Sequence, residues 1–443
     1  MDILKQKFAA KALPLAQELK AFNKESGHLV VGEYTIDQII GGMKGIKGLL
    51  TDTSALDPEL GISFRGYSIP ELREKLPRIP GGISPLPEGI FYLMLIGELP
   101  TEEDVQFISA EWQRRSNVPE HVFAMLNGLP LDTHPMTQFS MAILAMQNDS
   151  EFAAAYERGI SKDTYWEYVY EDAMNLIARL PRVAAYIYRR TFHNGHHIEP
   201  EPNLDWAGNF AHMLGIDNPS FKSMMRLYLT IHADHEGGNG SAHTTHLTGS
   251  MLSDPYYAFS SGINSLAGPL HGLANQEVIG WIFKMQKALG TESPTEAEIE
   301  QYIRTTLANK QVVPGYGHAV LRRTDPRFLA QQDFAKTYFP DDNLCQLVWK
   351  IYNVAPRVLG ETGKIKNPFP NVDAHSGALL LHYGFNEYTY YTVLFGVSRA
   401  LGVMAQLCWS RVYGLPLERP GSITFDALKK LAAKINEAST PKA

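Results

Sequence analysis

The sequence predicts a predominantly helical protein, because apolar residues recur with a helical period over long stretches while signs of β-strand are few. The helical stretches are 101–116, 165–190, 222–233, 273–289, 295–309, 343–359 and 389–413. Only the region of Val30, Val31, Tyr34 and Thr35, together with residues 61–67, has the pattern of short strands or a hairpin. With 443 residues, 44% of them apolar and 20% charged, the chain is long enough for a large core and a second domain.

The first residues are expected to form an amphipathic helix, with Ile3, Phe8, Leu13 and Leu19 placed among lysines. This stretch lacks the continuous apolar core of a signal peptide. A transit peptide would be richer in arginine and poorer in acidic residues. No targeting segment is therefore expected at this end.

Two later helix starts are marked by capping residues, at Thr101 with the acidic residues after it and at residues 295–298. The longest apolar stretch near the end of the chain, 393–409, is interrupted by Arg399. Since a membrane-spanning helix needs about 20 apolar residues, no such helix is expected and no membrane partner is predicted.

Charge and cysteine content argue against several classes of protein. The net charge is −7 and there is no basic tract, so nucleic acid is not an expected partner. Cys345 and Cys408 are too few for a disulfide framework and fit a reducing compartment. Anionic substrates would have to be attracted by local arginines against an acidic average.

The most informative loop reads Pro-Gly-Tyr-Gly-His at residues 314–318 and is followed by Arg322, Arg323 and Arg327. Two glycines and a proline interrupt any helix, so the backbone must turn here. Free backbone N–H groups, an imidazole and guanidinium groups are what a carboxylate or phosphate site requires. A surface histidine on a solvated basic edge would explain the same residues.

A second loop, Leu-Ala-Gly-Pro-Leu-His-Gly, ends at His271 and Gly272. The helical period that follows places His271 at or just before a helix N-terminus, where the helix dipole disfavours the imidazolium. A neutral imidazole can donate one N–H to an oxygen that is becoming negative, as in the established example of triosephosphate isomerase. Alternatively, His271 fills space in a turn and bonds to the backbone.

A third loop spans residues 367–377 and contains Asp373 before a helical run. Asp373 is either an N-cap or a carboxylate held rigidly as a general base. Lys364 and Lys366, just upstream, either meet phosphates or are solvated. Together the three loops offer two imidazoles, one carboxylate and several arginines, which suggests carbon–carbon bond formation without a metal.

The chain resembles citrate synthases of the type found in mitochondria and some bacteria, nearly from end to end. The matching segments are GGMKGIKGLL at 41–50, FRGYSIPEL at 64–72, LPEGIFYLML at 86–95, HADHEGGNGSAHTTHL at 232–247, LAGPLHGLANQEV at 266–278, VVPGYGHAVLRRTDPR at 312–327, NPFPNVDAHSG at 367–377, FGVSRALG at 395–402 and LERP at 417–420. Several long matches in one order are more specific than any single motif.

This resemblance implies an acyltransferase of the tricarboxylic acid cycle. Such an enzyme condenses acetyl-CoA with oxaloacetate through an enol or enolate, and then hydrolyses citryl-CoA to citrate and CoA. By resemblance, Asp373 is the base, His271 hydrogen-bonds the enol, and His318 polarises the oxaloacetate ketone. No cofactor and no metal are expected, since acetyl-CoA is a substrate.

The resemblance also implies the binding residues. Those for oxaloacetate are His235, Arg327, Arg399 and Arg419, with Arg419 reaching in from the partner of a homodimer. Those for CoA are Lys44, Val312, Val313, Gly315, Gly317, Arg322 and Lys366. Lys44, and similarly Lys162, stand where mitochondrial enzymes carry arginine, which keeps the charge but loses the bidentate fork.

The implied fold has a large helical domain, built from residues 1–272 and 385–443, and a small helical domain at 273–384. The active site would lie in the cleft between them, and closure would complete it. A bacterial cytoplasm is the expected location, with the mitochondrial matrix after transit-peptide removal as the alternative.

Three other interpretations stay open at this stage. A 2-methylcitrate synthase would use propionyl-CoA, which differs by one methylene. The histidines His232, His235, His243 and His246 crowd together beside acidic residues, as in a zinc hydrolase, although the HEXXH pattern is absent. A non-enzymatic helical scaffold would leave the three polar loops unexplained.

Overall fold

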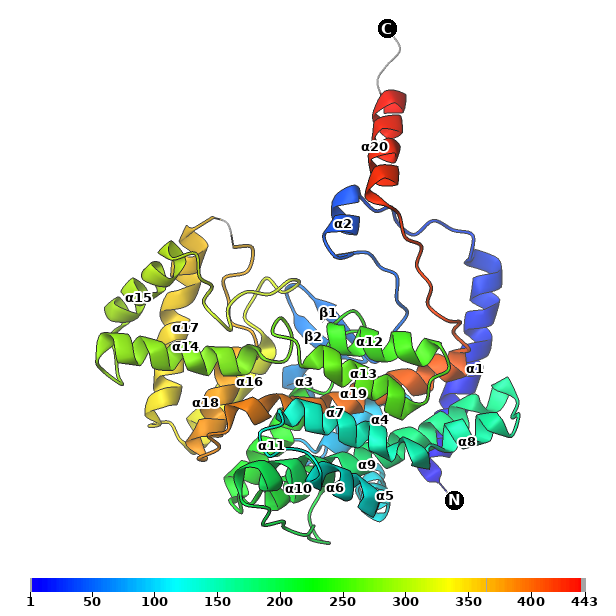
Figure 1. Cartoon of the computed structure of the whole chain (residues 1–443), viewed down its shortest axis with the longest axis horizontal. Helices are drawn as coiled ribbons and strands as arrows, with labels where there is room; N and C mark the ends of the chain where they lie inside the picture. The colour runs from blue at the N-terminus through cyan, green and yellow to red at the C-terminus, as the bar shows by residue number, and fades with distance from the viewer. Residues whose placement is uncertain (1, 364, 440–443) are drawn as a thin grey trace.

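A computed structural model of the chain describes residues 2–363 and 365–439, so Lys364 lies outside the described residues. The structure is mainly helical, which confirms the predicted fold class (Figure 1). The α-helices are α1 Ile3–Ser26, α2 Ile36–Ile40, α3 Ile69–Lys75, α4 Pro87–Ile96, α5 Glu102–Arg115, α6 Glu120–Asn127, α7 Pro135–Ala145, α8 Glu151–Glu157, α9 Tyr165–Phe192, α10 Trp206–Leu214, α11 Pro219–Ile231, α12 Gly240–Ser250, α13 Pro255–Leu266, α14 Ala274–Leu289, α15 Glu296–Ala308, α16 Pro326–Tyr338, α17 Asn343–Glu361, α18 Asp373–His382, α19 Tyr391–Tyr413 and α20 Phe425–Ser439.

Short 3-10 turns occur at Met146–Asp149, Lys162–Thr164 and Tyr388–Tyr390. One small antiparallel sheet has the order β1 (Ser54–Asp57), β2 (Gly61–Phe64), β3 (Tyr67–Ser68). The predicted strand at residues 61–67 is confirmed. The predicted strand around Val30 and Tyr34 is wrong, because that segment is exposed and without regular secondary structure, and no described strand pairs with it.

All seven helical stretches predicted from periodicity are present, as α5, α9, α11, α14, α15, α17 and α19. The capping boxes at Thr101 and Thr295 are also observed. The N-terminal helix forms, but its buried face is Leu4, Phe8, Ala12 and Ala16. Ile3 and Leu13 of the expected face are exposed, because the four-residue spacing from Leu4 points the small alanines at the body.

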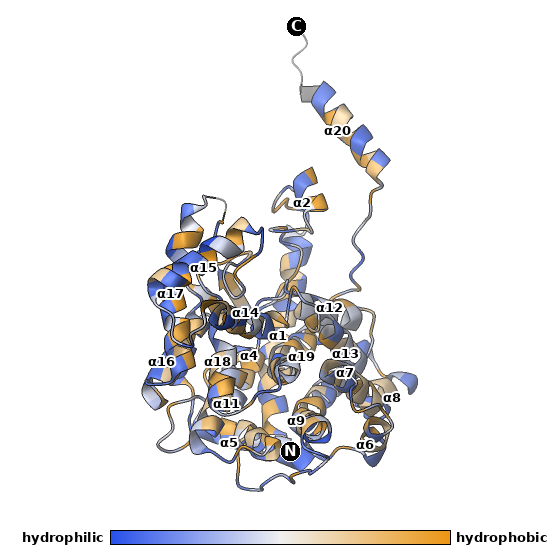
Figure 2. Cartoon of the chain, turned by 60° about the vertical axis from the view of Figure 1, so that its left-hand side comes forward, coloured by the Kyte–Doolittle hydropathy of each residue, from blue (hydrophilic) through white to orange (hydrophobic). Residues whose placement is uncertain are grey.

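The core is organised around α19, which packs against α9, α4, α1, α12 and α13. By length and composition the helix at 388–413 could cross a membrane, contrary to the expectation from sequence, yet its apolar window is wholly buried inside the fold. Helices α14–α18 gather at one end of the molecule, whereas α2 and α20 stand clear of the body (Figures 1 and 2). Residues 415–424 connect α19 to α20 without regular structure.

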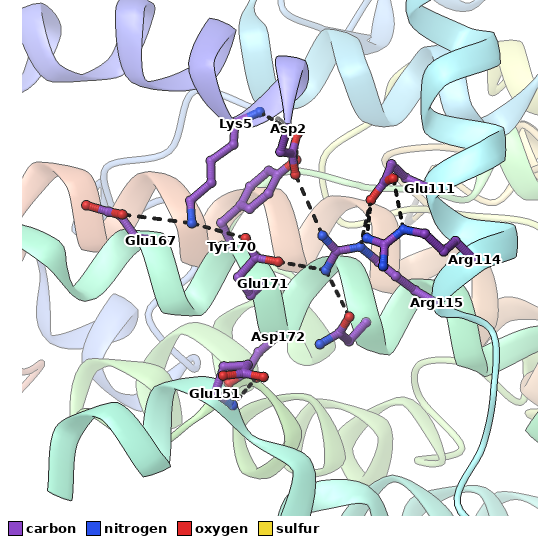
Figure 3. A network of polar contacts seen from close by, with 11 residues as sticks. Asp2, Lys5, Glu111, Arg114, Arg115, Glu151, Glu167, Tyr170, Glu171 and Asp172 are labelled. Carbon is purple, nitrogen blue, oxygen red and sulfur yellow. Dashed lines mark hydrogen bonds and ion pairs between the residues drawn. The ribbon is translucent and has the colours of Figure 1, made fainter. Parts of the chain in front are cut away.

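A polar network fastens α1 to α5 and α9 on the side away from α20 (Figure 3). Its centre is Arg115, whose side chain is 9% exposed. The guanidinium donates to Glu111 Oε2 at 3.1 Å and to Glu171 Oε2 at 2.7 Å. Lys5 Nζ donates to Glu171 Oε1 at 3.0 Å, so the first helix is tied to α9 through one carboxylate.

We expect Arg115→Ala to lower the free energy of unfolding by about 1–3 kcal/mol, because it leaves partly buried carboxylates without their donor. Arg114→Ala is the matched control, since Arg114 pairs with the same Glu111 but is 63% exposed. It should change stability by less than about 0.5 kcal/mol. Chemical denaturation at one protein concentration measures the free energy of unfolding of both variants. Equal losses in the two would contradict the role assigned to the burial of Arg115.

Candidate active site

One cavity of about 640 Å³ brings together residues that lie far apart in the sequence. It opens between the start of α12, the turn before α14, the loop before α16, the start of α18, and α19. The predicted site residues that line it are His235, His271, Gly317, His318, Arg327, Asp373 and Arg399. All three predicted loops therefore contribute to a single site.

His271 lies in the turn two residues before Leu273, the N-cap of α14, as predicted. Its Nε2 accepts a hydrogen bond from the Ser241 backbone N–H at 3.1 Å, and the Ser241 hydroxyl lies 3.0 Å away. Because an amide N–H can only donate, the imidazole proton must sit on Nδ1. Burial, with Arg399 nearby, lowers the pKa of His271 to about 3. His271 is thus a neutral imidazole whose Nδ1–H bonds to no described residue.

His318 has the opposite tautomer for the same kind of reason. Its Nδ1 accepts from the backbone N–H groups of Val320, at 3.0 Å, and Leu321, at 3.1 Å, so the proton lies on Nε2. Burial and the neighbouring Arg327 lower the pKa of His318 to about 4. The ring of His235 lies 5.3 Å from that of His318, centroid to centroid.

His235 is buried, and its Nε2 has no hydrogen-bond partner among the residues that the structure describes. A buried polar atom without a partner is costly unless a ligand or water satisfies it. Burial and Arg327 hold the pKa of His235 well below its ordinary value, so this imidazole is also neutral. It faces a cavity that can supply the missing partner.

Asp373 is the first residue of α18, and Val372 is the N-cap. The alternative that Asp373 serves as an N-cap is wrong, because Asp373 lies inside the first turn and Val372 occupies the N-cap position. Burial raises the pKa of this carboxyl to about 7, although Arg327 opposes the shift. A carboxylate that titrates near neutrality is matched to general-base chemistry.

The two buried arginines differ in how their charge is balanced. Arg327 makes a bidentate pair with Asp325, with a shortest distance of 2.7 Å between Nη2 and Oδ2. Arg399 instead donates to Asn239 Oδ1 at 2.8 Å and Ser241 Oγ at 3.0 Å. No carboxylate in the described part of the chain forms a salt bridge with Arg399. Arg399 is therefore a buried cation that an anionic ligand can pair with.

The loop at 314–318 and the loop before Asp373 hold each other in place. Gly317 N donates to Phe369 O at 3.1 Å, and Asn371 N donates to Gly315 O at 2.9 Å. Gly315 has φ +77°, and a Cβ there would lie 2.7 Å from Val278 Cγ2. Only glycine fits such a conformation in so close an approach.

The remaining predicted residues lie outside the cavity. Val313 is buried in the core, whereas Val312, Lys44 and Lys366 are exposed. The Arg322 guanidinium folds back on its own loop and donates to the carbonyls of Val320 and Leu321, both at 2.7 Å. Arg419 is exposed on the segment that leaves the body.

Sequence reasoning singled out neither Asn239 nor Ser241, which connect Arg399 to His271. Asn239 is the N-cap of α12 and accepts from Ala242 N at 3.2 Å. The only available signal was the motif NGSAHTTHL, in which an asparagine before small residues is typical of a helix start. That pattern says nothing of a buried arginine on α19.

The histidine-rich segment does not converge on a metal. His232 and His235 do not share a helix, contrary to the expectation, because α11 ends at Ile231. His232 Nδ1 donates to Tyr228 O at 2.8 Å, and His243 and His246 contact a glutamate instead. Within residues 2–363 and 365–439, no three or more His, Cys, Asp or Glu side chains form a group that could hold a metal ion.

A base that titrates near neutrality opposite a neutral imidazole donor is machinery for moving protons, so the fold and site define an enzyme rather than a scaffold. A family model described as "Citrate synthase, C-terminal domain" matches residues 42–421. The chain belongs to the citrate synthase family, whose members are acyltransferases.

Relatives of known name are similar over almost the whole chain. A probable mitochondrial citrate synthase of Glossina morsitans morsitans is 57% identical over 433 residues, covering 97% of this chain and 93% of the relative. The mitochondrial citrate synthase of Xiphias gladius is 56% identical over 424 residues, covering 95% of this chain and 90% of the relative.

Solved structures confirm the fold at lower identity. The citrate synthase of Pyrobaculum aerophilum matches with a TM-score of 0.75 and 25% identity, over 90% of this chain and 95% of that chain. The citrate synthase of Thermoplasma acidophilum, solved as a ternary complex with carboxymethyl coenzyme A and oxaloacetate, matches with a TM-score of 0.72 and 24% identity. That match covers 88% of this chain and 96% of that chain.

The raised pKa of Asp373 has a consequence for stability. The pKa is about 7 in the folded protein and about 3.9 in an unfolded chain, so folding favours the protonated form. The stability that this proton contributes is complete below pH 4 and is lost as pH rises through 7. Asn has no charge to bury, so Asp373→Asn should be more stable than wild type at pH 8, by about 1–3 kcal/mol.

The advantage of Asp373→Asn should shrink when the thermal midpoints are measured again at pH 5. The exposed Asp132→Asn is the control and should shift neither midpoint. If Asp373→Asn is less stable than wild type at pH 8 while the control is unchanged, burial of the ionised Asp373 carboxylate does not destabilise the folded protein.

Proposed function

We propose that this chain condenses acetyl-CoA with oxaloacetate and hydrolyses the resulting citryl-CoA to citrate and CoA. The observation that carries the proposal is one cavity lined by both a base of pKa about 7 and a neutral imidazole whose Nδ1–H has no partner among the described residues. The relatives named citrate synthase, and the ternary complex of the Thermoplasma protein, support these substrates.

In the first step Asp373 takes a proton from the methyl group of acetyl-CoA. The electron pair of that C–H bond moves toward the thioester oxygen, to which His271 Nδ1–H donates a hydrogen bond. A neutral donor suits this role, because a developing enolate oxygen is better matched by an imidazole than by a fully ionised partner in a buried site. Ser241 N–H keeps the proton of His271 on the correct nitrogen.

In the second step the enol carbon attacks the ketone of oxaloacetate. His318 Nε2–H polarises the ketone oxygen and supplies a proton as that oxygen becomes the alcohol. Asp373 has gained one proton and His318 has given one, so the charge of the site is balanced. Arg327, Arg399 and His235 bind the two carboxylates. Water then attacks the thioester carbonyl carbon, and the C–S bond breaks to release CoA. Of the two protons of water and the one held by Asp373, one returns to His318, one goes to the CoA thiolate and one is released with citrate.

The coenzyme would lie along residues 312–317, with Gly317 at the cavity and Val312, Val313 and Gly315 supplying backbone. Lys44, Arg322 and Lys366 would meet the phosphates. Arg322 must first release the carbonyls to which it now donates. The proton transfers above use only side chains and substrates, so the prediction of no cofactor and no metal stays part of the proposal.

A homodimer is supported by apolar side chains left exposed on the projecting segments. Val30, Val31, Ile40 and Phe425 are 84%, 93%, 70% and 71% exposed, and they lie in or beside α2 and α20. Exposed apolar surface of this kind marks an interface. In this dimer Arg419 would enter the partner's cavity, which lacks it in a single chain.

We also propose that the chain is divided into a large domain at 1–272 and 385–443 and a small domain at 273–384, as the resemblance to citrate synthases implies. Helices α14–α18 would then move toward the rest of the fold when substrate binds.

The location proposed is the mitochondrial matrix, because the relatives reported above are named as mitochondrial enzymes. The expectation of a bacterial cytoplasm has no such support.

Free thiol release by the purified protein tests the proposal, with acetyl-CoA and propionyl-CoA compared at fixed oxaloacetate. We expect acetyl-CoA to be the better substrate. Asp373→Asn should lower turnover by about 10²–10⁴-fold, since an amide cannot take the methyl proton. Oxaloacetate binding, measured by calorimetry, should remain. Preference for propionyl-CoA would favour a 2-methylcitrate synthase, and an active Asp373→Asn would remove Asp373 from the mechanism.

A further inference from the structure

The segment that carries Arg419 is fastened to the body at one residue. It leaves the end of α19 and leads to α20, which stands clear of the body in both views (Figures 1 and 2). Between residues 416 and 423, all of which are described, only Glu418 makes hydrogen bonds to the body. Glu418, the residue next to Arg419, therefore fixes the position from which this segment extends away from the body.

Glu418 is held by two histidines and a serine of α12. Its Oε2 lies 3.1 Å from His243 Nε2, and its Oε1 contacts His246 Nδ1. Its backbone N–H donates to Ser250 Oγ at 3.0 Å. A carboxylate only accepts hydrogen bonds, so both imidazoles donate to it. His243 and His246 are three residues apart, which puts them on one face of the helix.

The other ring nitrogen of His246 is also hydrogen-bonded. Its Nε2 lies 2.9 Å from Ser410 Oγ on α19. With Nδ1–H donating to Glu418, Nε2 of a neutral ring accepts from the Ser410 hydroxyl. The side chains of His246 and Glu418 are 14% and 18% exposed, so water competes little for these bonds. The chain Ser410–His246–Glu418 thus joins the core helix to the projecting segment.

Serine, histidine and glutamate in this order also form the triad of hydrolases. That function does not fit this place in the fold. Ser410 is buried, and the cavity beside it is only about 10 Å³, which leaves no room for an acyl group. A water molecule alone needs a cavity of about that size. The same contacts are better suited to holding a segment than to attacking a substrate.

We propose that His243 and His246 are positioning residues for Arg419, and that they act by clamping Glu418. The inference rests on the proposed function, in which Arg419 completes the partner's oxaloacetate site. The helix that carries the clamp has Asn239 as its N-cap and Ser241 in its first turn, and these two residues bond to Arg399 and His271 of the chain's own site. One rigid helix therefore fixes both the chain's own site and the arginine that it lends to its partner.

The first test compares variants that remove or keep the donor. His246→Leu removes the Nδ1–H, whereas His246→Asn places an amide N–H near the same position; His243→Leu and His243→Gln form the corresponding pair. We expect the leucine variants to raise the KM for oxaloacetate about tenfold or more with a smaller change in kcat. The amide variants should restore most of the affinity. Equal KM values in the leucine and amide variants would overturn the proposal.

Non-additivity separates positioning from a general structural effect. In an Arg419→Ala background, His246→Leu should change the KM for oxaloacetate less than about twofold, because the residue that it positions is already gone. A structural role would lower activity by the same factor in both backgrounds.

Mixed dimers, purified through two different affinity tags, show which site the clamp serves. In the first mixed dimer, His246→Leu and Asp373→Asn are on the same chain and the other chain is wild type. The active site that keeps Asp373 is then on the wild-type chain and receives Arg419 from the chain with the loosened clamp, so its KM should be high. In the second mixed dimer, the two substitutions are on different chains. The active site that keeps Asp373 then receives Arg419 from a chain whose clamp is intact, so its KM should be normal. The reverse pattern would overturn the proposal.

The same mixed dimers, made with Arg419→Ala in place of His246→Leu, serve as the reference. If Arg419→Ala fails to follow the crossed pattern, the shared site of the proposed function is wrong. If Arg419→Ala follows it and His246→Leu does not, the dimer stands and only the clamp is overturned.

Discussion

The buried guanidinium of Arg399, which forms no salt bridge with any carboxylate among the described residues, is the constraint on which the active site depends. Arg399 lies on α19, the helix around which the core is built, so it cannot move out to water. Burying an unpaired charge costs several kcal/mol, and the surrounding donors and acceptors must be arranged to limit that cost. Asn239 and Ser241 accept from it, and its guanidinium lies 4.8 Å from the centre of the Phe395 ring.

This cation determines the chemistry of its neighbours. Ser241, which accepts from Arg399, also meets His271 Nε2 and so fixes the tautomer of that imidazole. Burial, with the positive charge of Arg399 nearby, lowers the pKa of His271 and keeps it neutral. Asp373 is buried enough that its pKa rises to about 7. Arg399 forms no salt bridge within the described part of the chain, and the nearby Asp373 carboxylate is held close to its titration point. The cavity is therefore suited to an anionic substrate that supplies a negative charge for Arg399.

Much of this site could be predicted from sequence, because glycines and prolines reveal where the backbone must turn, and three such turns with polar side chains together pointed to one site although each had a structural explanation of its own. His271, His318 and Asp373 were found in this way, and long amphipathic helices such as α9 and α17 were found from their period. The resemblance to a known family supplied the roles of Arg327 and Arg399.

Other features depend on contacts between distant residues and left no local signal. Helix α12, GSAHTTHLTGS, has no apolar period because small polar residues let it pack closely against α13 and α19. The bonds of Glu418 to His243 and His246 join positions more than 170 residues apart. Val30 and Val31 have strand-forming side chains but lie beside no described strand, because β-propensity requires a partner to be expressed.

The central claim is that oxaloacetate completes a cationic cavity and thereby shapes the site for the acyl-CoA. The most direct test is a calorimetric titration of a non-reactive acetyl-CoA analogue, with and without saturating oxaloacetate. Because a ligand shifts a conformational equilibrium by its differential affinity for the two states, oxaloacetate should tighten the analogue by about 5–150-fold. Equal affinities in the two titrations would contradict the account.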